Sequence, residues 1–325
     1  MYSPIDWQPS ATNETLRRRA TLLRDIREFF WQRDVLEVDT QALSLASISD
    51  PHIDVLTTKA KCLGKEQTYY LQTSPEFAMK RLLCADIGDI YQLGKAFRAE
   101  EQSLRHSIEF TMLEWYRVGF DHWQLMYEIE ALLVSLTQDG QLRCQFKSYQ
   151  EAFEQYVGID PFSAELTDLQ NVAYQHTEFG LTETNRNSLL ELLFSTLVEP
   201  KIGQTQPCFI HSYPASQAAL ARKHDNEKGQ QVAARFELYW QGMELANGYH
   251  ELVDATEQEE RMQADTALRQ HIGAAERQLD ERLSTALKVG LSTCAGVALG
   301  VDRLLMILLG VDDISLVMPF AADRV

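Results

Sequence analysis

A short stretch in the first half of the chain combines the side-chain types that bind nucleotides and cations. It contains, in order, Arg98, Glu100, His106, Ser107, Phe110, Glu114 and Tyr116. Residues 109–116 are rich in β-forming side chains, and side chains alternate between the two faces of a strand. Phe110, Glu114 and Tyr116 therefore share one face. An aromatic ring, an anion and a phenol on one face predict a site that holds a nucleotide beside a small cationic molecule.

The arginines suggest how a nucleotide would be bound. Arg98 can hold a phosphate through two parallel hydrogen bonds, and the planar Arg303 side chain can stack on a base opposite Phe110. Glu100 can accept a hydrogen bond from a base amino group. A surface arginine–glutamate pair and a core phenylalanine explain the same residues, and for the Phe-Arg-x-Glu motif alone they are the more frequent explanation.

Two glutamates later in the chain are candidates for a metal site. Glu237 and Glu244 flank Gly242, which predicts a turn, so the two carboxylates would converge across a hairpin. Two carboxylate oxygens together with phosphate oxygens are a usual ligand set for Mg²⁺. Two solvated glutamates in an acidic chain are the simpler explanation of the pair taken alone.

A second set of acids, Glu76, Glu114 and Glu251, joins Tyr116 as a candidate cation pocket. Carboxylates that converge on one pocket repel one another unless a cation lies among them, and a diamino acid would supply that cation. Glu114 lies within an apolar strand, where an unpaired charge is costly. Unrelated surface acids are the alternative explanation.

Small and amide side chains complete the candidate site. Asn247 precedes Gly248, a pair typical of a hairpin turn, but its amide can equally contact a substrate carboxylate. Ala298 and Gly300 are small enough to form the floor under a ligand, and close packing of strands explains them equally well.

The periodicity of the sequence predicts the elements that must position these residues. Helices are expected at residues 14–33, 74–88, 122–136, 188–198, 259–287 and 302–309, with Ser74 as the N-cap and Pro75 at the first helical position. Strands are expected at residues 35–40, 68–73, 89–97, 109–120, 234–241, 243–251 and 296–300. Antiparallel strands with helices set to one side indicate an α+β fold. Residues 138–218 are interpreted as an elaboration within a single domain of residues 1–325, and the polar run 222–229 as a mobile loop.

The composition disfavours several classes of protein. The 325 residues suffice for one large domain or two ordinary ones, and the net charge of −17 disfavours a nucleic-acid-binding surface, which needs Lys and Arg to neutralise phosphates. The five cysteines are isolated in the sequence, so we expect a reducing cytoplasm and no structural zinc. No apolar run reaches the length of a membrane span, and no signal peptide is recognisable.

Taken together and in order, five segments resemble the catalytic domain of class II aminoacyl-tRNA synthetases, and of lysyl-tRNA synthetase in particular. They are residues 73–76 (Thr-Ser-Pro-Glu), 97–101 (Phe-Arg-Ala-Glu-Glu), 105–116, 244–252 and 296–303. The resemblance spans nearly the whole chain. It implies the class II catalytic fold, an antiparallel sheet flanked by helices, working with ATP and Mg²⁺.

Two departures from lysyl-tRNA synthetase narrow the resemblance. The first helix is expected by about Glu14, which leaves no room for the N-terminal OB-fold domain that reads the anticodon, and Ala298 stands where lysyl-tRNA synthetase has glycine. Both features are similar to those of the elongation factor P–(R)-β-lysine ligase family, a group of stand-alone synthetase paralogs. In a third departure, Gln41 follows Thr40 where class II enzymes usually have proline, in a segment that serves their dimer interface.

This resemblance implies a reaction in two steps. ATP activates (R)-β-lysine as an aminoacyl-adenylate, and the β-lysyl group then passes to a lysine ε-amino group of elongation factor P, not to tRNA. The resemblance also implies a cytoplasmic homodimer that acts without a membrane.

The resemblance assigns roles to individual residues. The catalytic residues it implies are Arg98, Glu244 and Arg303. ATP would be bound by Arg98, Glu100, His106, Ser107, Phe110, Glu237, Glu244, Leu245, Gly300 and Arg303, with Mg²⁺ held by Glu237 and Glu244. The amino acid would be bound by Ser74, Glu76, Glu114, Tyr116, Asn247, Glu251 and Ala298.

Three other interpretations remain. A truncated lysyl-tRNA synthetase-like enzyme that activates α-lysine is the nearest alternative. An amide-forming relative such as asparagine synthetase would need cationic groups for a carboxylate side chain, and Glu114 and Glu251 have the wrong sign. A regulatory protein that binds a ligand without catalysis is disfavoured because the candidate phosphate and metal ligands occur together: Arg98, Glu237, Glu244 and Arg303.

Overall fold

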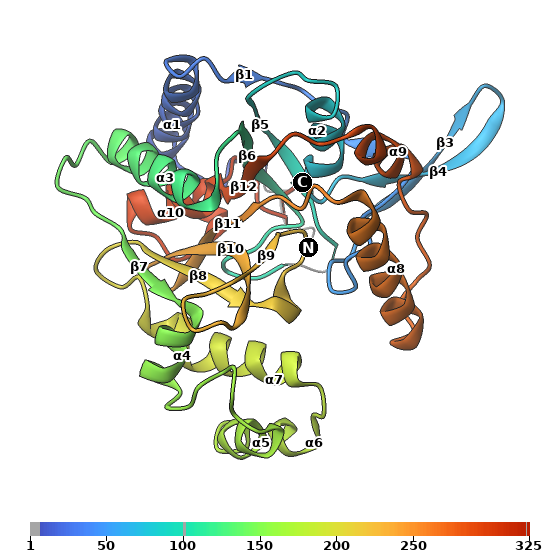
Figure 1. Ribbon diagram of the computed structural model, residues 1–325. Coiled ribbons are helices and arrows are strands. Elements are labelled where there is room, and N and C mark those ends of the chain that lie inside the picture. The colour runs from blue at the N-terminus through green and yellow to red at the C-terminus, as the bar shows by residue number, and fades with distance from the viewer. Residues whose placement is uncertain (1–6, 100–101, 323) are drawn as a thin grey trace, which may run out of the picture.

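The frame of the molecule is a large sheet whose strands come from widely separated parts of the chain (Figure 1). The computed structural model describes residues 7–99, 102–322 and 324–325. The strands are β1 (Leu36–Glu37), β5 (Ile90–Phe97), β6 (Glu109–Val118), β7 (Gln145–Ser148), β8 (Cys208–Pro214), β9 (Lys223–Asp225), β10 (Gln231–Trp240), β11 (Met243–His250) and β12 (Cys294–Gly300). Within the described residues their order is β1-β5-β6-β12-β11-β10-β8-β7, with β9 paired to β10 beside this path. Only β1–β5 and β7–β8 are parallel among these described pairs, so the sheet is mainly antiparallel.

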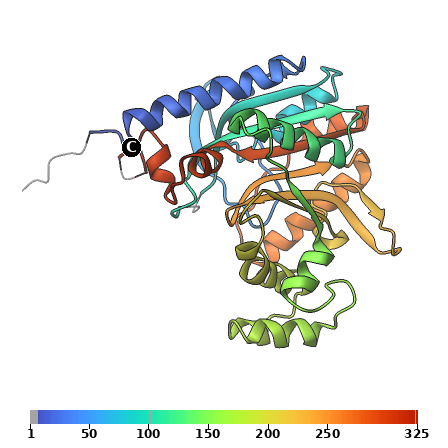
Figure 2. The ribbon, with the colours of Figure 1, turned by 90° about the vertical axis from the view of Figure 1, so that its left-hand side faces the viewer.

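Three helices cover one face of the sheet and enclose the main core. They are α1 (Asn13–Trp31), α3 (His122–Thr137) and α10 (Val301–Leu309), and a short helical turn at Ile314–Val317 follows them. Figure 2 shows α1 running along the upper side of the molecule. The ring of Phe30 in α1 stacks on Tyr91 of β5 at a centroid distance of 4.5 Å. This face also buries Leu113, Trp115, Val297 and Leu299, and the opposite face is left for polar side chains because strand residues alternate.

A buried ion pair ties α1 to α10 and β6. The Arg19 guanidinium donates to a carboxylate oxygen of Asp302 at 2.6 Å and to the Thr111 hydroxyl at 2.6 Å. The second oxygen of Asp302 accepts the backbone N–H of Thr111, also at 2.6 Å. Because Asp302 and Arg303 lie in the first turn of α10, this network fixes the start of the helix that carries Arg303.

The chain between α3 and β10 forms a second apolar cluster, in the lower part of Figure 1. Its helices are α4 (Tyr149–Tyr156), α5 (Leu166–Tyr174), α6 (Phe179–Thr182) and α7 (Arg186–Leu193), with helical turns at Phe194–Val198, Glu199–Lys201 and Ala215–Gln217. The rings of Tyr149 and Phe194 stack at 4.9 Å, beside Ile210 and Tyr213 of β8. Strands β7 and β8 come from this segment, so it is joined to the main sheet by backbone hydrogen bonds.

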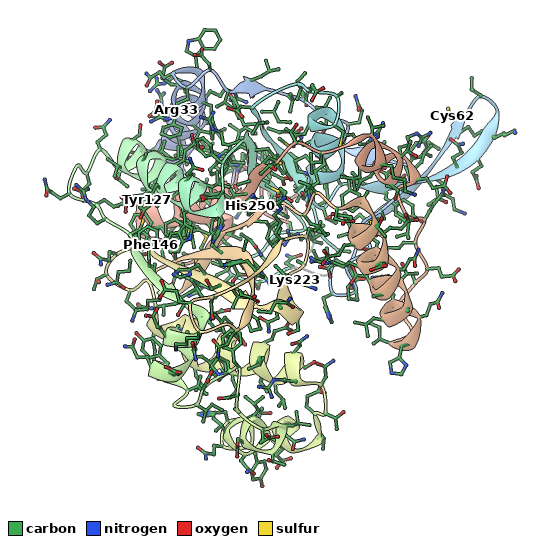
Figure 3. The ribbon with its side chains drawn as sticks, in the orientation of Figure 1. Arg33, Cys62, Tyr127, Phe146, Lys223 and His250 are labelled. Carbon is green, nitrogen blue, oxygen red and sulfur yellow. The ribbon has the colours of Figure 1, made fainter. Side chains whose placement is uncertain are left out.

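A third group of elements covers part of the polar face. Helix α2 (Glu76–Leu83) packs against α9 (Glu281–Val289), which follows α8 (Ala255–His271), and Met79 and Leu83 of α2 are buried beside Tyr116. Strands β2 (Leu43–Ser44), β3 (Thr57–Cys62) and β4 (Lys65–Leu71) form a small separate sheet. The β3–β4 hairpin projects from the body, with Cys62 near its outer end (Figure 3). This packing holds α2 over the strand face that carries Tyr116.

Most of the predicted elements are confirmed. The antiparallel β5–β6 pair, the β10–β11 hairpin around Gly242, strand β12 and helices α1, α3 and α10 lie close to their expected ranges. The prediction of a loop over the whole polar run 222–229 was wrong. Lys223–Asp225 forms strand β9, which pairs with β10. No helix in the described part of the chain is long and apolar enough to cross a bilayer.

Four other local predictions need correction. The strand expected at 35–40 reduces to the two residues of β1 that pair with β5. The helix expected at 259–287 is two helices, because the chain adopts a left-handed conformation at Gly273 (φ +73°) just after α8. Helix α2 begins at Glu76, with Pro75 at the N-cap position expected for Ser74, and it ends at Leu83, before the position expected near Gly88.

The Asn247–Gly248 pair is not a turn. It lies inside β11, with Asn247 opposite Ala298 and Gly248 opposite Val297. A Cβ atom on Gly248 would come within 2.4 Å of the Phe236 ring. The glycine is therefore required by close packing between strands, and Asn247 is left facing the polar side.

Candidate active site

The polar face of the sheet presents two rows of side chains that cross five strands. The first row, from β5 to β10, is Gln92, Glu114, Ala298, Asn247 and Glu237. The second row is Ile90, Tyr116, Gly296, Tyr249 and Arg235. Directly opposed residues in antiparallel strands point to the same face, so the register alone gathers residues that are distant in sequence.

Glu114 is the centre of an acid pocket at one end of these rows. Its side chain is 2% exposed, and its two oxygens accept hydrogen bonds from the hydroxyls of Ser74 at 2.7 Å and Tyr116 at 2.8 Å. Burial, and then the charges of Glu76 and Glu251, raise the pKa of Glu114 to about 8. The structure thus brings together the predicted cation-binding acids, and it shows an excess of negative charge around them.

A buried lysine that sequence reasoning missed lies among these acids. Lys80 in α2 is 0% exposed, and its Nζ atom lies 2.7 Å from Oε1 of Glu76 and 2.7 Å from Oε2 of Glu251. Burial lowers the pKa of Lys80, but Glu251 and Glu76 outweigh burial and the net direction is upward. Burial, opposed by Lys80 and assisted by Glu76, raises the pKa of Glu251 to about 7. The sequence signal for the contact was the i,i+4 spacing of Glu76 and Lys80 on one helix.

The end of the site next to the loop before β6 and the first turn of α10 is cationic. Arg303 donates to the backbone oxygen of Glu244 at 2.8 Å, and its second nitrogen lies 2.5 Å from Nε2 of His106. The Arg98 guanidinium lies 5.4 Å from the ring centroid of Phe110. In the structure Arg98 therefore lies beside the Phe110 ring, whereas Arg303 is held by His106 and the backbone oxygen of Glu244.

The remaining predicted nucleotide ligands surround this end. Ser107 follows His106 in the loop before β6, and Glu100 lies outside the described residues. The Leu245 side chain is buried in the core, so only its backbone can face a ligand. Gly300 precedes α10, and a Cβ atom there would lie 3.8 Å from Cδ of Arg303 and 3.9 Å from the Leu245 oxygen.

Glu237 and Glu244, the predicted metal ligands, lie in different environments. Glu237 accepts hydrogen bonds from Tyr213 at 2.6 Å and Asn247 at 3.2 Å, and also from Tyr239 and Arg235. The carboxylate of Glu244 accepts no hydrogen bond from a described residue. Burial and the charge of Glu237, opposed by Arg303, raise the pKa of Glu244 to about 7. Glu244 therefore has the uncompensated charge that a cation would neutralise.

Sequence reasoning also missed the partners of Glu237. Arg235 lies two residues before Glu237 on the same strand and pairs with it, and Tyr213 reaches it from β8. The period of two along β10 could have revealed Arg235. Tyr213 could not have been found, because the β8–β10 pairing joins distant segments. Among the described residues, no three Asp, Glu, His or Cys side chains gather closely enough to hold a metal ion by themselves.

Comparison with known proteins agrees with this geometry. The model of the family described as tRNA synthetases class II (D, K and N) matches residues 1–324. An elongation factor P–(R)-β-lysine ligase of Vibrio cholerae is 49% identical over 98% of both chains, and one of Pseudoalteromonas translucida is 48% identical over 98% of both. A third, of Mannheimia succiniciproducens, is 46% identical over 100% of both. The chain therefore belongs to the class II tRNA synthetase family, in the group that contains the elongation factor P–(R)-β-lysine ligases.

Proposed function

We propose that this protein activates (R)-β-lysine with ATP and joins the β-lysyl group to a lysine ε-amino group of elongation factor P. The observation that carries the proposal is the row Glu114, Ala298 and Asn247. Here the central anion of the acid pocket, a methyl group and an amide lie side by side on neighbouring strands. The shared name of the relatives supports the same activity.

The acid pocket is suited to the two ammonium groups of the substrate. Glu114, Tyr116 and Glu251 would hold the ε-ammonium group, with Ser74 orienting Glu114 by their 2.7 Å hydrogen bond. Glu76 would bind the second ammonium group. Asn247 donates one N–H to Glu237 at 3.2 Å, and its other N–H is available to the substrate carboxylate.

The cationic end is suited to ATP. Phe110 would stack on adenine, and Glu100 would accept a hydrogen bond from its amino group. Arg98 would bind the α-phosphate, and the joined pair His106 and Arg303 the terminal phosphates. Ser107 and the backbone around Leu245 and Gly300 would line the nucleotide. In this arrangement the α-phosphate would lie next to the substrate carboxylate.

In the first step, a carboxylate oxygen of (R)-β-lysine attacks the α-phosphorus of ATP, and pyrophosphate leaves. No proton transfer and no protein nucleophile is needed. The protein contributes by positioning the two reactants and by stabilising, through Arg98 and Arg303, the negative charge that develops at phosphorus. Glu244 would act with them as a metal ligand.

Glu244 and Glu237 fit a magnesium ion. Glu244 supplies a half-buried carboxylate without a hydrogen-bond donor among the described residues, and its raised pKa reflects an unmet negative charge. Glu237 is already paired with Arg235, so it would share its carboxylate between arginine and metal. When bound, Mg²⁺ neutralises charge on the phosphates.

In the second step, the ε-amino group of the target lysine attacks the carbonyl carbon of the adenylate. The bond from carbon to the AMP oxygen breaks, an amide bond forms, and the amine loses a proton to solvent. As part of the same proposal, residues 1–325 form one catalytic domain that works as a cytoplasmic homodimer and acts without tRNA or a membrane.

ATP–pyrophosphate exchange tests the proposal directly. We expect exchange with (R)-β-lysine to exceed exchange with α-lysine, and no exchange with neutral amino acids. Incubation with elongation factor P should then add one β-lysyl group, measured by mass spectrometry. Preference for α-lysine would favour the lysyl-tRNA synthetase-like alternative, and absence of exchange with any amino acid would overturn the activation step.

A further inference from the structure

Lys80 has a placement that the proposed reaction does not explain. It lies in the middle of α2, directly after the buried Met79 and three residues before the buried Leu83. Its side chain is fully buried. A lysine at i+4 from a glutamate normally forms an exposed pair of little energetic value. Here the ammonium group is held inside the protein instead, among the acids that would bind the substrate.

The carboxylates of Glu76 and Glu251 are shared between Lys80 and the pocket. Lys80 takes one oxygen of Glu76 and one oxygen of Glu251, each at 2.7 Å. The other Glu251 oxygen, Oε1, is buried and accepts no hydrogen bond from a described residue. A Cβ atom on Gly296 would come within 2.6 Å of this oxygen, so the oxygen faces the space above that glycine. Gly296 lies beside Tyr116 in the second row, which places the oxygen in the pocket.

The charges of the pocket do not balance without a ligand. When the three carboxylates are ionised, as the binding of ammonium groups requires, Glu76, Glu114 and Glu251 face one ammonium group, and the formal charge is two units negative. Tyr116, Tyr249, Cys84 and Cys294 also lie near Lys80 or Glu251, and burial raises the pKa of each of them, which keeps them neutral. Uncompensated buried charge is costly, so the pocket favours a ligand that brings two positive charges.

We propose that Lys80 is a positioning residue that sets the charge selectivity of this pocket: it neutralises one unit of acid, fixes Glu76 and Glu251, and leaves the pocket matched to a dication. This inference rests on the proposed function, because it takes the acid pocket to be the amino-acid site. With Lys80 the pocket excludes amino acids that carry one ammonium group. Without it, Glu76 and Glu251 would repel each other and move apart.

Competition on the unaltered protein tests the selectivity without any substitution. The probes are 1,4-diaminopentane, which keeps both ammonium groups of (R)-β-lysine and lacks its carboxylate, and 1-aminopentane, its singly charged counterpart. We expect the diamine to inhibit ATP–pyrophosphate exchange at a concentration at least roughly 10-fold lower than the concentration of 1-aminopentane that gives the same inhibition. Equal inhibition by the two amines would overturn the proposal.

Substitution tests the role of Lys80 itself. In K80A we expect the KM for (R)-β-lysine to rise roughly 100-fold, with the KM for ATP nearly unchanged, because a buried partner of two carboxylates is removed. Methylammonium or ethylammonium in the assay should restore much of the loss by filling the vacated ammonium position. K288A is the matched control, since Lys288 pairs with Glu259 on the surface at 2.9 Å.

The outcomes separate this inference from the proposed function. A K80A variant that is folded and binds ATP, yet has an unchanged KM for the amino acid or is not rescued by alkylammonium ions, would overturn the role of Lys80. If K80A does not fold, K80M keeps the apolar stem and the same rescue is measured on it. The exchange assay shows which amino acid is activated, and mass spectrometry shows separately whether elongation factor P accepts it. Failure of the transfer to elongation factor P therefore leaves the result for Lys80 intact.

Discussion

At the residue scale, protons and substrate compete for the same carboxylates. The pKa of Glu114 is raised to about 8 and that of Glu251 to about 7, so both hold protons in the empty pocket near neutral pH. Ammonium groups bind the ionised carboxylates and must displace these protons. Affinity for (R)-β-lysine is therefore expected to increase as the pH rises from about 6 to 8, with release of protons on binding.

Calorimetry measures this linkage. Titration of (R)-β-lysine in two buffers with different ionisation enthalpies gives the number of protons released. We expect a release that decreases above pH 8, where the carboxylates are already ionised. An affinity that does not depend on pH would show that Glu114 and Glu251 are ionised without ligand.

Ala298 is the residue expected to separate β-lysine from α-lysine. It lies between Glu114 and Asn247 on the pocket face, where its methyl group would narrow the space around the backbone of the proposed substrate. In A298G we expect activation of α-lysine relative to β-lysine to increase about 10-fold to 100-fold, since one methyl-sized difference is worth about 1–3 kcal/mol. Ala295, on the same strand but facing the core, provides the control A295G. An unchanged ratio in A298G would reject the steric explanation.

Single residues were predictable where chemistry and spacing coincided. The acid pocket around Glu114 was predicted because this charged residue lies within an apolar strand. The pair of Glu237 and Glu244 was predicted because the glycine between them indicates a turn. Lys80 and Arg235 were not recognised, because a charged residue near a glutamate usually forms a surface pair. Whether such a residue is buried depends on helix and strand packing that one sequence does not reveal.

At the element scale, the Arg19–Asp302 pair holds α10 on the sheet. In R19M, Asp302 would remain buried without its counter-ion, and we expect a loss of about 3–5 kcal/mol in the free energy of unfolding. Since Asp302 precedes Arg303, ATP affinity should fall as well. Urea unfolding followed by circular dichroism measures the first effect.

The control for this prediction lies on the same helix. Arg24 pairs with Asp25 at 2.9 Å, and both side chains are exposed, so R24M should cost no more than about 0.5 kcal/mol. A variant R19M that is as stable as R24M would show that the buried pair does not anchor the helix.

Elements with local signals were predictable, and elements that depend on distant pairing were not. Helices α1 and α3 have an apolar stripe of helical period, and the β5–β6 and β10–β11 pairs join neighbouring segments. Strand β9 was missed because Lys223–Asp225 is polar and exposed, and gains its structure only by pairing with β10. The short parallel strand β7 likewise depends on a partner far along the chain, and β1, predicted over 35–40, keeps only the two residues that pair with β5.

At the scale of the whole molecule, the edge of the sheet at β1 is the surface where we expect the proposed dimer to form. Leu36 is 50% exposed on this edge strand, and Leu43 nearby is 46% exposed. A groove of about 1180 Å³ is lined in part by Asp39, Thr40 and Gln41, which lie between these two leucines in the sequence. Exposed apolar side chains on an unpaired edge favour association with another chain.

Sedimentation velocity tests this expectation. The protein should sediment at about twice the 37.1 kDa mass of one chain, and L36D should shift it toward one chain. L63D is the control, because Leu63 is 100% exposed at the tip of the β3–β4 hairpin, away from β1. A dimer that L36D leaves intact would place the interface elsewhere, and a monomeric protein would reject the dimer.

The position of β12 between β6 and β11 has a consequence during synthesis on the ribosome. Cys294–Gly300 emerges after both of its neighbours, so until then two partial sheets each present an unpaired edge. Such edges promote aggregation of nascent chains. Glu114 lies on one partial sheet and Asn247 on the other, so neither ATP nor the amino acid can stabilise the unfinished protein. Productive folding therefore waits for the last strand, and the growing chain is expected to need chaperone protection until that strand arrives.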